Sequence, residues 1–461
     1  MRLLSSRTLT FHEFVEDSSR PRYAILSHRW EDDEVGYKHM RKPERRGLAE
    51  AKKGFAKISA CAKQALAHGL EYFWVDTCCI DKSSSAELSE AINSMFRWYR
   101  DAAHCYVYLC DTPPAPERYF AAYPGWEAEF TQSVGFSRGW TLQEMIAPQT
   151  LTFYARDWTW GGDKRDVSLL KAIEGKTGVP GHVLYTGDVS STSLAQRMSW
   201  IAHRQTTRTE DMAYCLLGIF DINMPLLYGE GDRAFLRLQQ EILKASDDMS
   251  IFCWTDPDAS FATYSGLLAR SPLHFAACQD IRWNPVGGNP PFDPTNKGIR
   301  ITLELKPVSG RKDESIAVLR GVQGPRESGT IGLYLHKIGV DQYARVDPHL
   351  VCQGLEPTPM RMTTFFVRQN PVMETGNYLH SRTGSLFMKV GPGPLRLVGG
   401  YPAECWDDEA SRFCFDRSAM AETTGHPLNT KAEFHIRMGK DRTILITVDD
   451  SMSVNEWNAE S

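Results

Sequence analysis

The stretch SRGWTLQE, residues 137–144, places an indole and a carboxylate four residues apart, directly after a glycine. In a helix, positions i and i+4 lie on the same face, so Trp140 and Glu144 would stand one turn apart. A carboxylate can stabilise positive charge that develops in a transition state, and an indole face attracts a cationic ring. A solvated surface Glu beside a packed Trp is the other interpretation of the same pattern. The pair is therefore a candidate site, and its place in the fold decides between the two.

Polar residues follow an apolar run near the N-terminus. Ser27, His28 and Trp30 come at the end of the run that starts at residue 22. Loops after buried strands often build ligand pockets, so these residues are candidates for binding a substrate. A helix-capping Ser with a packed His and Trp would give the same pattern. No partner nucleophile lies near His28 in the sequence, which disfavours a Ser/His triad.

Two more charged residues are candidates for substrate binding. Asp76 ends the apolar run LEYFWV and could bind ribose hydroxyls, or cap the loop that follows. Arg138 precedes Trp140 and could bind a phosphate, or pair with an acid at the surface.

The elements that would position these residues alternate between strand and helix. Apolar runs at 22–29, 70–76, 104–111 and 150–158 predict strands, and helical periodicity predicts helices over 48–69, 84–99 and 139–146. Such alternation implies right-handed crossovers and a parallel sheet, hence an open α/β domain over residues 1–165. Ser27, His28, Asp76, Asp111 and the loop before Trp140 would then meet at the carboxyl edge of the sheet.

The rest of the chain has a different pattern. Residues 166–250 are predominantly helical, with Phe235, Leu238 and Ile242 on one helix face. Residues 251–461 contain short alternating runs between Gly/Pro-rich segments, which predict a separate antiparallel β domain. The glycines of YGEGDRAF lack the Lys and Ser/Thr of a phosphate-binding loop.

Composition narrows the function classes. The 461 residues are 42% hydrophobic with a formal net charge of −5, typical of a globular protein and without the basic excess that nucleic acid requires. The 11 cysteines include no CxxC pair, which indicates reduced thiols and no metal site. No apolar run is long enough to span a membrane, so we expect a cytoplasmic protein.

Several ordered blocks resemble the signatures of fungal heterokaryon incompatibility (HET) domain proteins over roughly residues 1–255. These blocks are YAILSHRWEDDEV, YFWVDTCCIDKSS, SRGWTLQEMIAP, RTEDMAYCLLGIFDINMPLLYGEGDRAFLRLQQEI and SDDMSIFCW. The resemblance implies a fungal effector of self/non-self recognition whose activation leads to programmed cell death, as in innate immunity.

The same blocks are similar, more distantly, to a TIR domain, which implies a flavodoxin-like parallel sheet. SRGWTLQE resembles the TIR pattern of a Ser, a Trp and a Glu four residues after the Trp, although Thr141 stands where that family has a Cys. In TIR domains that cleave NAD, this Glu is the catalytic carboxylate, so the resemblance assigns that role to Glu144. NAD or a related nucleotide would be the substrate, no cofactor would be needed, and self-association would complete the site.

One carboxylate is chemically sufficient for this reaction. The nicotinamide of NAD is already cationic and leaves as a neutral molecule without a proton, unlike an ordinary sugar leaving group. Glu144 would stabilise the oxocarbenium-like transition state, and Trp140 would contact the pyridinium ring. The alternative from a different class is a non-catalytic signalling module that assembles with copies of itself and recognises a protein partner through its C-terminal domain.

Overall fold

The computed structural model describes residues 1–42, 44, 46–114, 124–259, 264–285, 290–308, 311, 313–324, 329–355 and 362–371, and seven strand segments between 384 and 459. It divides the chain into two compact units. Residues 1–246 and 270–279 form the first unit, and residues 247–269 and 280–461 form the second. The segment predicted as α/β and the predicted helical segment up to residue 246 thus belong to one unit.

The first unit is built on a seven-stranded mixed sheet with the order β2-β1-β4-β3-β5-β6-β7. Strands β3, β4, β5 and β6 are parallel to their neighbours and correspond to the four predicted strands. The described strands of this sheet are β1 (Arg2–Ser5), β2 (Phe11–Glu13), β3 (Tyr23–His28), β4 (Tyr72–Trp74), β5 (His104–Tyr108), β6 (Leu151–Tyr154) and β7 (Trp160–Asp163).

The edges of this sheet correct the prediction of a parallel sheet throughout residues 1–165. β1 is antiparallel to β2 and β4, and β7 is antiparallel to β6. The connections over residues 6–10 and 155–159 are too short for a crossover, which needs a dozen residues or more, so these strands return as hairpins.

Three helices connect the parallel strands. α3 (Phe55–Ala67) follows β3, α5 (Ser85–Asp101) follows β4, and α7 (Thr141–Ile146) precedes β6. Right-handed crossovers place α3 on one face of the sheet and α5 and α7 on the other, and α5 packs against α7. Shorter helices of the α/β part are α1 (Tyr37–Met40), α2 (Arg46–Glu50), α4 (Asp76–Cys79) and α6 (Pro124–Gln132).

The sheet and its helices bury an apolar core. Every residue of β3 is buried, and Phe73 and Trp74 of β4 are fully enclosed. Ser84 caps the amino end of α5, because its hydroxyl accepts a hydrogen bond from the Glu87 backbone N–H at 3.3 Å. The core therefore fixes β3 and α7, the two elements that carry the candidate site.

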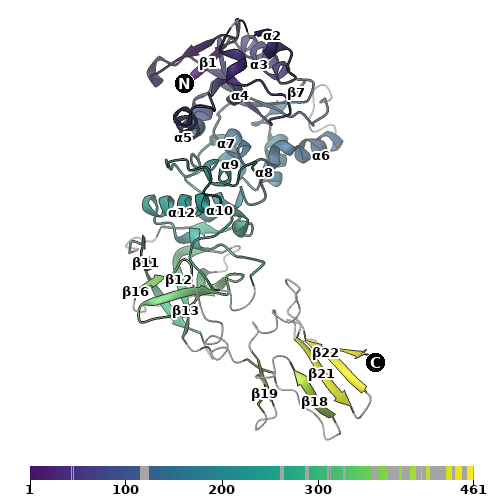
Figure 1. Cartoon of the computed structure of the whole chain (residues 1–461), viewed down its shortest axis with the longest axis vertical. Coiled ribbons are helices and arrows are strands. Elements are labelled where there is room, and N and C mark those ends of the chain that lie inside the picture. The colour runs from purple at the N-terminus through teal and green to yellow at the C-terminus, as the bar shows by residue number, and fades with distance from the viewer. Residues whose placement is uncertain are drawn as a thin grey trace. The chain divides into compact units, whose positions relative to one another are not determined.

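The helical part of the first unit appears in teal in Figure 1. It contains α8 (Val167–Thr177), α9 (Gly181–Thr186), α10 (Leu194–Ser199), α11 (Asp211–Tyr214) and α12 (Arg233–Ala245). α12 buries Phe235, Leu238 and Ile242, the apolar face that the sequence predicts.

The second unit is β-rich, which confirms the prediction for the C-terminal region. Its larger sheet has the order β10-β11-β16-β14-β13-β12-β9, with β15 paired to β13 and β8 paired to β14. These strands are β8 (Tyr264–Ser265), β9 (Arg282–Trp283), β10 (Asp293–Thr295), β11 (Gly298–Pro307), β12 (Glu314–Gln323), β13 (Thr330–Lys337), β14 (Gln342–Val346), β15 (Cys352–Leu355) and β16 (Met362–Val367).

Two smaller sheets follow in the same unit. One has the order β17-β20-β19 and the other β18-β21-β22-β23. Their strands are β17 (Gly384–Leu386), β18 (Leu395–Gly400), β19 (Trp406–Asp407), β20 (Arg412–Phe415), β21 (Ala432–Met438), β22 (Arg442–Val448) and β23 (Val454–Ala459). In the described parts of the chain, we find no helix with the length and apolarity needed to cross a membrane.

Candidate active site

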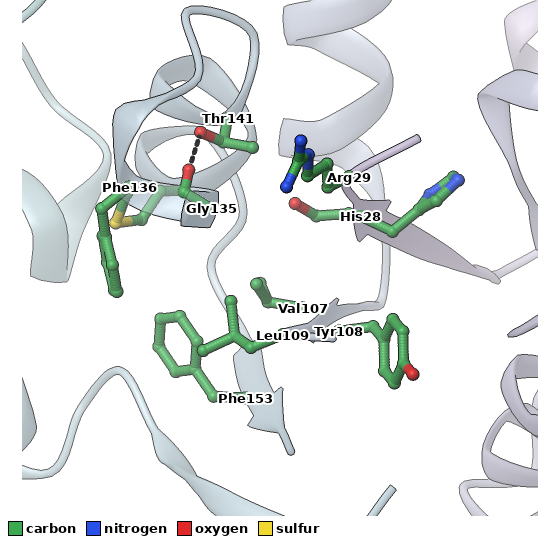
Figure 2. Close-up of a pocket in the computed structure, with 11 residues that line it drawn as sticks. His28, Arg29, Val107, Tyr108, Leu109, Gly135, Phe136, Thr141 and Phe153 are labelled. Carbon is green, nitrogen blue, oxygen red and sulfur yellow. Dashed lines mark hydrogen bonds between the residues drawn. The ribbon is translucent and has the colours of Figure 1, made fainter. Parts of the chain in front are cut away.

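A pocket opens at the carboxyl ends of β3 and β5 (Figure 2). The connection after β3 leads to β4 on one side of β3, and the connection after β4 leads back to β5 on the other side. The direction of the connections therefore reverses between β3 and β5, and open α/β sheets bind their ligands at such a point. The residues that line the pocket are Ser27, His28, Arg29, Val107, Tyr108, Leu109, Gly135, Phe136, Thr141, Met145 and Phe153. Most of this lining is apolar, which suits a flat, weakly polar group.

Glu144 is not among the residues that line this pocket. Its side chain is buried, with 6% of the residue exposed, and its carboxylate accepts a hydrogen bond from the Ser27 hydroxyl at 2.6 Å. The interpretation of Glu144 as a solvated surface residue is therefore wrong. All six residues of α7 are buried, because this short helix packs on the sheet below β3. Ser27 lines the pocket, so its hydroxyl connects the pocket to the carboxylate.

The environment of Glu144 makes its carboxyl group easy to protonate. Burial raises the pKa of Glu144 to about 7, while Arg138 and the hydrogen bond from Ser27 oppose that rise. A pKa near neutrality means that the ionised and protonated forms are both populated under ordinary conditions. Such a value is typical of catalytic acids and bases, and it also occurs in buried structural carboxyls.

The Arg138 side chain contacts the backbone of His28 and not its imidazole ring. Arg138 Nη1 donates to the His28 carbonyl oxygen at 2.6 Å. Figure 2 shows the His28 imidazole turned away from Phe136 and Thr141, and its Nδ1 lies 3.8 Å from Asp76 Oδ1. Burial lowers the pKa of His28 to about 3, so its ring is neutral near pH 7. Neither of these two facing atoms has a hydrogen-bond partner among the described residues.

Asp76 and Trp30 form the outer part of this cluster. The Trp30 indole N–H donates to Asp76 Oδ2 at 2.7 Å, and 43% of Trp30 is exposed. Lys82 Nζ lies 3.3 Å from the centre of the Trp30 ring, a cation–π contact that sequence reasoning missed. Burial lowers the pKa of Lys82, and the carboxylate of Asp76 opposes this change.

Among the described residues, no group of three or more His, Cys, Asp or Glu side chains is arranged to hold a metal ion.

Trp140 contacts the helical part of the unit. Its indole N–H donates to Asp211 Oδ2 at 3.3 Å, and Tyr228 donates its hydroxyl to Asp211 Oδ1 at 2.9 Å. Trp140 is not among the residues that line the pocket, so its role as a substrate-binding residue stays a prediction. Asp211 lies in the RTEDMAY block, which the sequence analysis quoted without assigning a site residue to it.

These features define an α/β domain with a pocket at its topological switch point. Residues 23–122 match the family described as heterokaryon incompatibility protein (HET). Over 240 residues the chain is 48% identical to the vegetative incompatibility protein HET-E-1 of Podospora anserina, an alignment that covers 51% of this chain and 17% of that relative. The N-terminal part of the chain is therefore a heterokaryon incompatibility domain, as its resemblance predicted. No solved structure matches the chain.

Proposed function

We propose that the chain is an effector of fungal heterokaryon incompatibility whose N-terminal domain hydrolyses the nicotinamide–ribose bond of NAD, or of a related nucleotide, and thereby triggers cell death. Its similarity to a vegetative incompatibility protein supports the cellular role. The chain spans 17% of that relative's length, so the activity is proposed for this domain alone.

The strand order supports a TIR-like, flavodoxin-like domain. The parallel strands β4-β3-β5-β6 come in the order second, first, third and fourth along the chain, as in flavodoxin-like sheets. Their switch point lies between β3 and β5, where the pocket opens. A sheet of this kind would hold a nucleotide at that edge.

The Ser27–Glu144 hydrogen bond is the observation that carries the proposal. It places one buried carboxylate 2.6 Å from the hydroxyl of Ser27, a residue that lines the pocket. A ribose hydroxyl that displaced the Ser27 hydroxyl would bring the sugar against Glu144, and the ionised carboxylate would stabilise the developing oxocarbenium ion. The apolar lining by Phe136, Met145 and Phe153 would receive the nicotinamide as it becomes neutral.

The test is the substitution Glu144→Gln, which keeps the size of the side chain and its capacity to accept the Ser27 hydrogen bond. We expect nicotinamide release from NAD to fall on the order of a hundredfold or more, the scale of losing one preorganised electrostatic contact. Glu210→Gln is the matched control, because Glu210 is also buried, with 8% exposed, and accepts hydrogen bonds from the backbone of Gly229 and Gly231 away from the pocket. The control should keep the parental rate.

A non-catalytic assembly module is the second candidate, and the burial of Glu144 favours it. A carboxyl that already has a hydrogen-bond partner could serve to fix α7 under β3. A folded Glu144→Gln protein that still releases nicotinamide at the parental rate would reject Glu144 as the catalytic carboxylate. If the assembled parent also leaves NAD intact, the assembly module becomes the better proposal.

A further inference from the structure

Residues after α10 form backbone hydrogen bonds with the loop that leads into α7. The Gln205 N–H donates to the Ser137 carbonyl at 2.7 Å, and the Gln205 carbonyl accepts from the Gly139 N–H at 2.8 Å. Gln205 thus pairs with Arg138 as residues of neighbouring parallel strands do. The loop that carries Arg138 is held from outside the α/β part.

Arg204 strengthens this attachment at the first residue of α7. Its Nη1 donates to the Arg138 carbonyl at 2.9 Å and to Thr141 Oγ1 at 3.2 Å, and its Nε donates to the Trp200 carbonyl at 3.1 Å. Thr141 in turn donates its hydroxyl to the Gly135 carbonyl at 2.5 Å, the bond drawn in Figure 2. Arg204 therefore fixes both the loop and the first turn of the helix that carries Glu144.

The position of Arg204 is costly for stability. The residue is only 6% exposed, and burial lowers the pKa of its guanidinium to about 10, so the group stays charged at neutral pH. A buried charge is unfavourable unless it is fully paired, and a cation at the amino end of a helix opposes the partial charge of the backbone there. Its hydrogen bonds to the Arg138 carbonyl and to Thr141 thus point to a role in positioning α7. Cys215 and then Glu144 oppose the fall in the Arg204 pKa.

Gly139 explains how the helical part can come so close. A Cβ at this position would lie 2.6 Å from Thr206 Cγ2 and 3.1 Å from Cys215 Sγ. Only a residue without a side chain leaves room for this approach. Asp211 adds a fourth attachment through its bond to Trp140, so each residue from 137 to 141 is held by, or packed against, the helical part.

We propose that Arg204, Gln205 and Asp211 form a clamp that sets the geometry of the site, with Arg204 as the positioning residue for Glu144. This inference rests on the proposed function for its effect on rate, and on the contacts alone for its effect on structure. The clamp makes the helical part an integral component of the site. Arg204 acts through Arg138 and Thr141 and does not contact substrate.

Arg204→Lys tests the clamp, because Lys keeps the charge but cannot bond the Arg138 carbonyl, Thr141 and Trp200 together. We expect amide hydrogen exchange over residues 137–146 of the full chain to rise by about tenfold, with β3 and β5 unchanged, since the variant loosens only this segment. The kcat for NAD cleavage should fall on the order of tenfold to a hundredfold with little change in KM, the signature of lost positioning. Arg197→Lys is the matched control, since Arg197, on α10, also donates to a backbone carbonyl, that of Thr192 just before the same helix.

Thr141→Val is the second variant and is decisive if Arg204→Lys does not fold, because it removes the oxygen that Arg204 contacts and leaves Arg204 in place. It should raise exchange in the same segment. If both variants fold, the clamp is rejected when both show the same amide exchange over residues 137–146 as Arg197→Lys. If Arg204→Lys does not fold, the same result for Thr141→Val alone rejects it. It is also rejected as a positioning device if exchange rises while kcat stays parental in an active parent. If the parent itself does not cleave NAD, the proposed function fails, and the exchange measurements alone decide whether the clamp exists.

Discussion

Burial changes the pKa of two titratable residues near the end of β3 in opposite directions, His28 on β3 itself and Glu144 on α7. Glu144 has its pKa raised to about 7, and His28 has its pKa lowered to about 3, in both cases because burial disfavours the charged form. The folded protein therefore binds the Glu144 proton more tightly than the unfolded chain does, and the His28 proton less tightly. Their contributions to the pH dependence of stability oppose each other between about pH 4.5 and 6.5.

The substitution Glu144→Gln separates these contributions. In the parent, the protonated Glu144 stabilises the fold below its unfolded pKa of 4.5, and this stability is lost as the pH rises through about 7. The loss amounts to about 3 kcal/mol in the free energy of unfolding. Urea unfolding measures the free energy of unfolding at pH 5 and at pH 8. Between these two pH values the variant should lose less of this free energy than the parent does, and the difference should approach about 3 kcal/mol.

An exposed acid supplies the control for this prediction. Glu127→Gln, on α6, should leave the difference between pH 5 and pH 8 as in the parent. If Glu144→Gln and the parent have the same pH dependence, Glu144 is not protonated in the folded protein near neutrality, and the environment described for it is wrong.

The sequence predicted which residues gather near the site better than it predicted how they face one another. Ser27 and Glu144 were both candidates, and a hydrogen bond joins them, because a strand end and the following crossover helices must meet in an α/β sheet. Whether Glu144 faces water or the sheet depends on how α7 packs, and a six-residue helix has too little periodicity to show this. The contact between Trp140 and Asp211 joins positions 71 residues apart, which no local pattern reveals.

Among the elements, the four parallel strands were predictable because they are buried on both faces and so appear as continuous apolar runs. The hairpin strands β1, β2 and β7 were not predictable from the sequence, because they are only three or four residues long. Exposed residues in β2 and β7 also break the alternation of buried and exposed positions that marks a strand. The predicted helices α3, α5 and α12 have clear apolar faces, and α8 to α11 lie within the segment predicted to be helical. Element type therefore followed from burial pattern, and the direction of the edge strands did not.

A tight contact joins α5 to the helical part of the first unit. A Cβ at Gly218 would lie 2.0 Å from the Cβ of Phe96, on α5, so any side chain there forces the backbones apart. We expect Gly218→Ala to lower the free energy of unfolding by about 1 to 3 kcal/mol, the cost of overpacking a core. Thermal or urea unfolding of the full chain measures this change.

Gly175→Ala is the matched comparison, because Gly175 lies within α8 with no atom near its missing Cβ. Replacing a glycine inside a helix should stabilise it by up to about 1 kcal/mol. If Gly218→Ala proves as stable as Gly175→Ala, α5 and the helical part do not pack as closely as described.

For the molecule as a whole, we predict that any NAD cleavage depends on assembly. The resemblance to TIR domains implies that a neighbouring subunit would complete the site, and a higher protein concentration favours association by mass action. The specific rate should therefore rise with protein concentration and with crowding agents, followed by nicotinamide release alongside light scattering. A rate strictly proportional to enzyme in a monodisperse monomer contradicts this prediction.

The clamp also bears on how the chain is made. Arg204 is synthesised 60 residues after Glu144, by the difference of their positions. At ribosomal speeds of about 5 to 20 residues per second, the carboxylate leaves the ribosome roughly 3 to 12 s before the residues that fix its helix. A chain that ends between these two residues thus carries Glu144 without its clamp, and under the proposed function we expect such a chain to cleave NAD more slowly than the complete one.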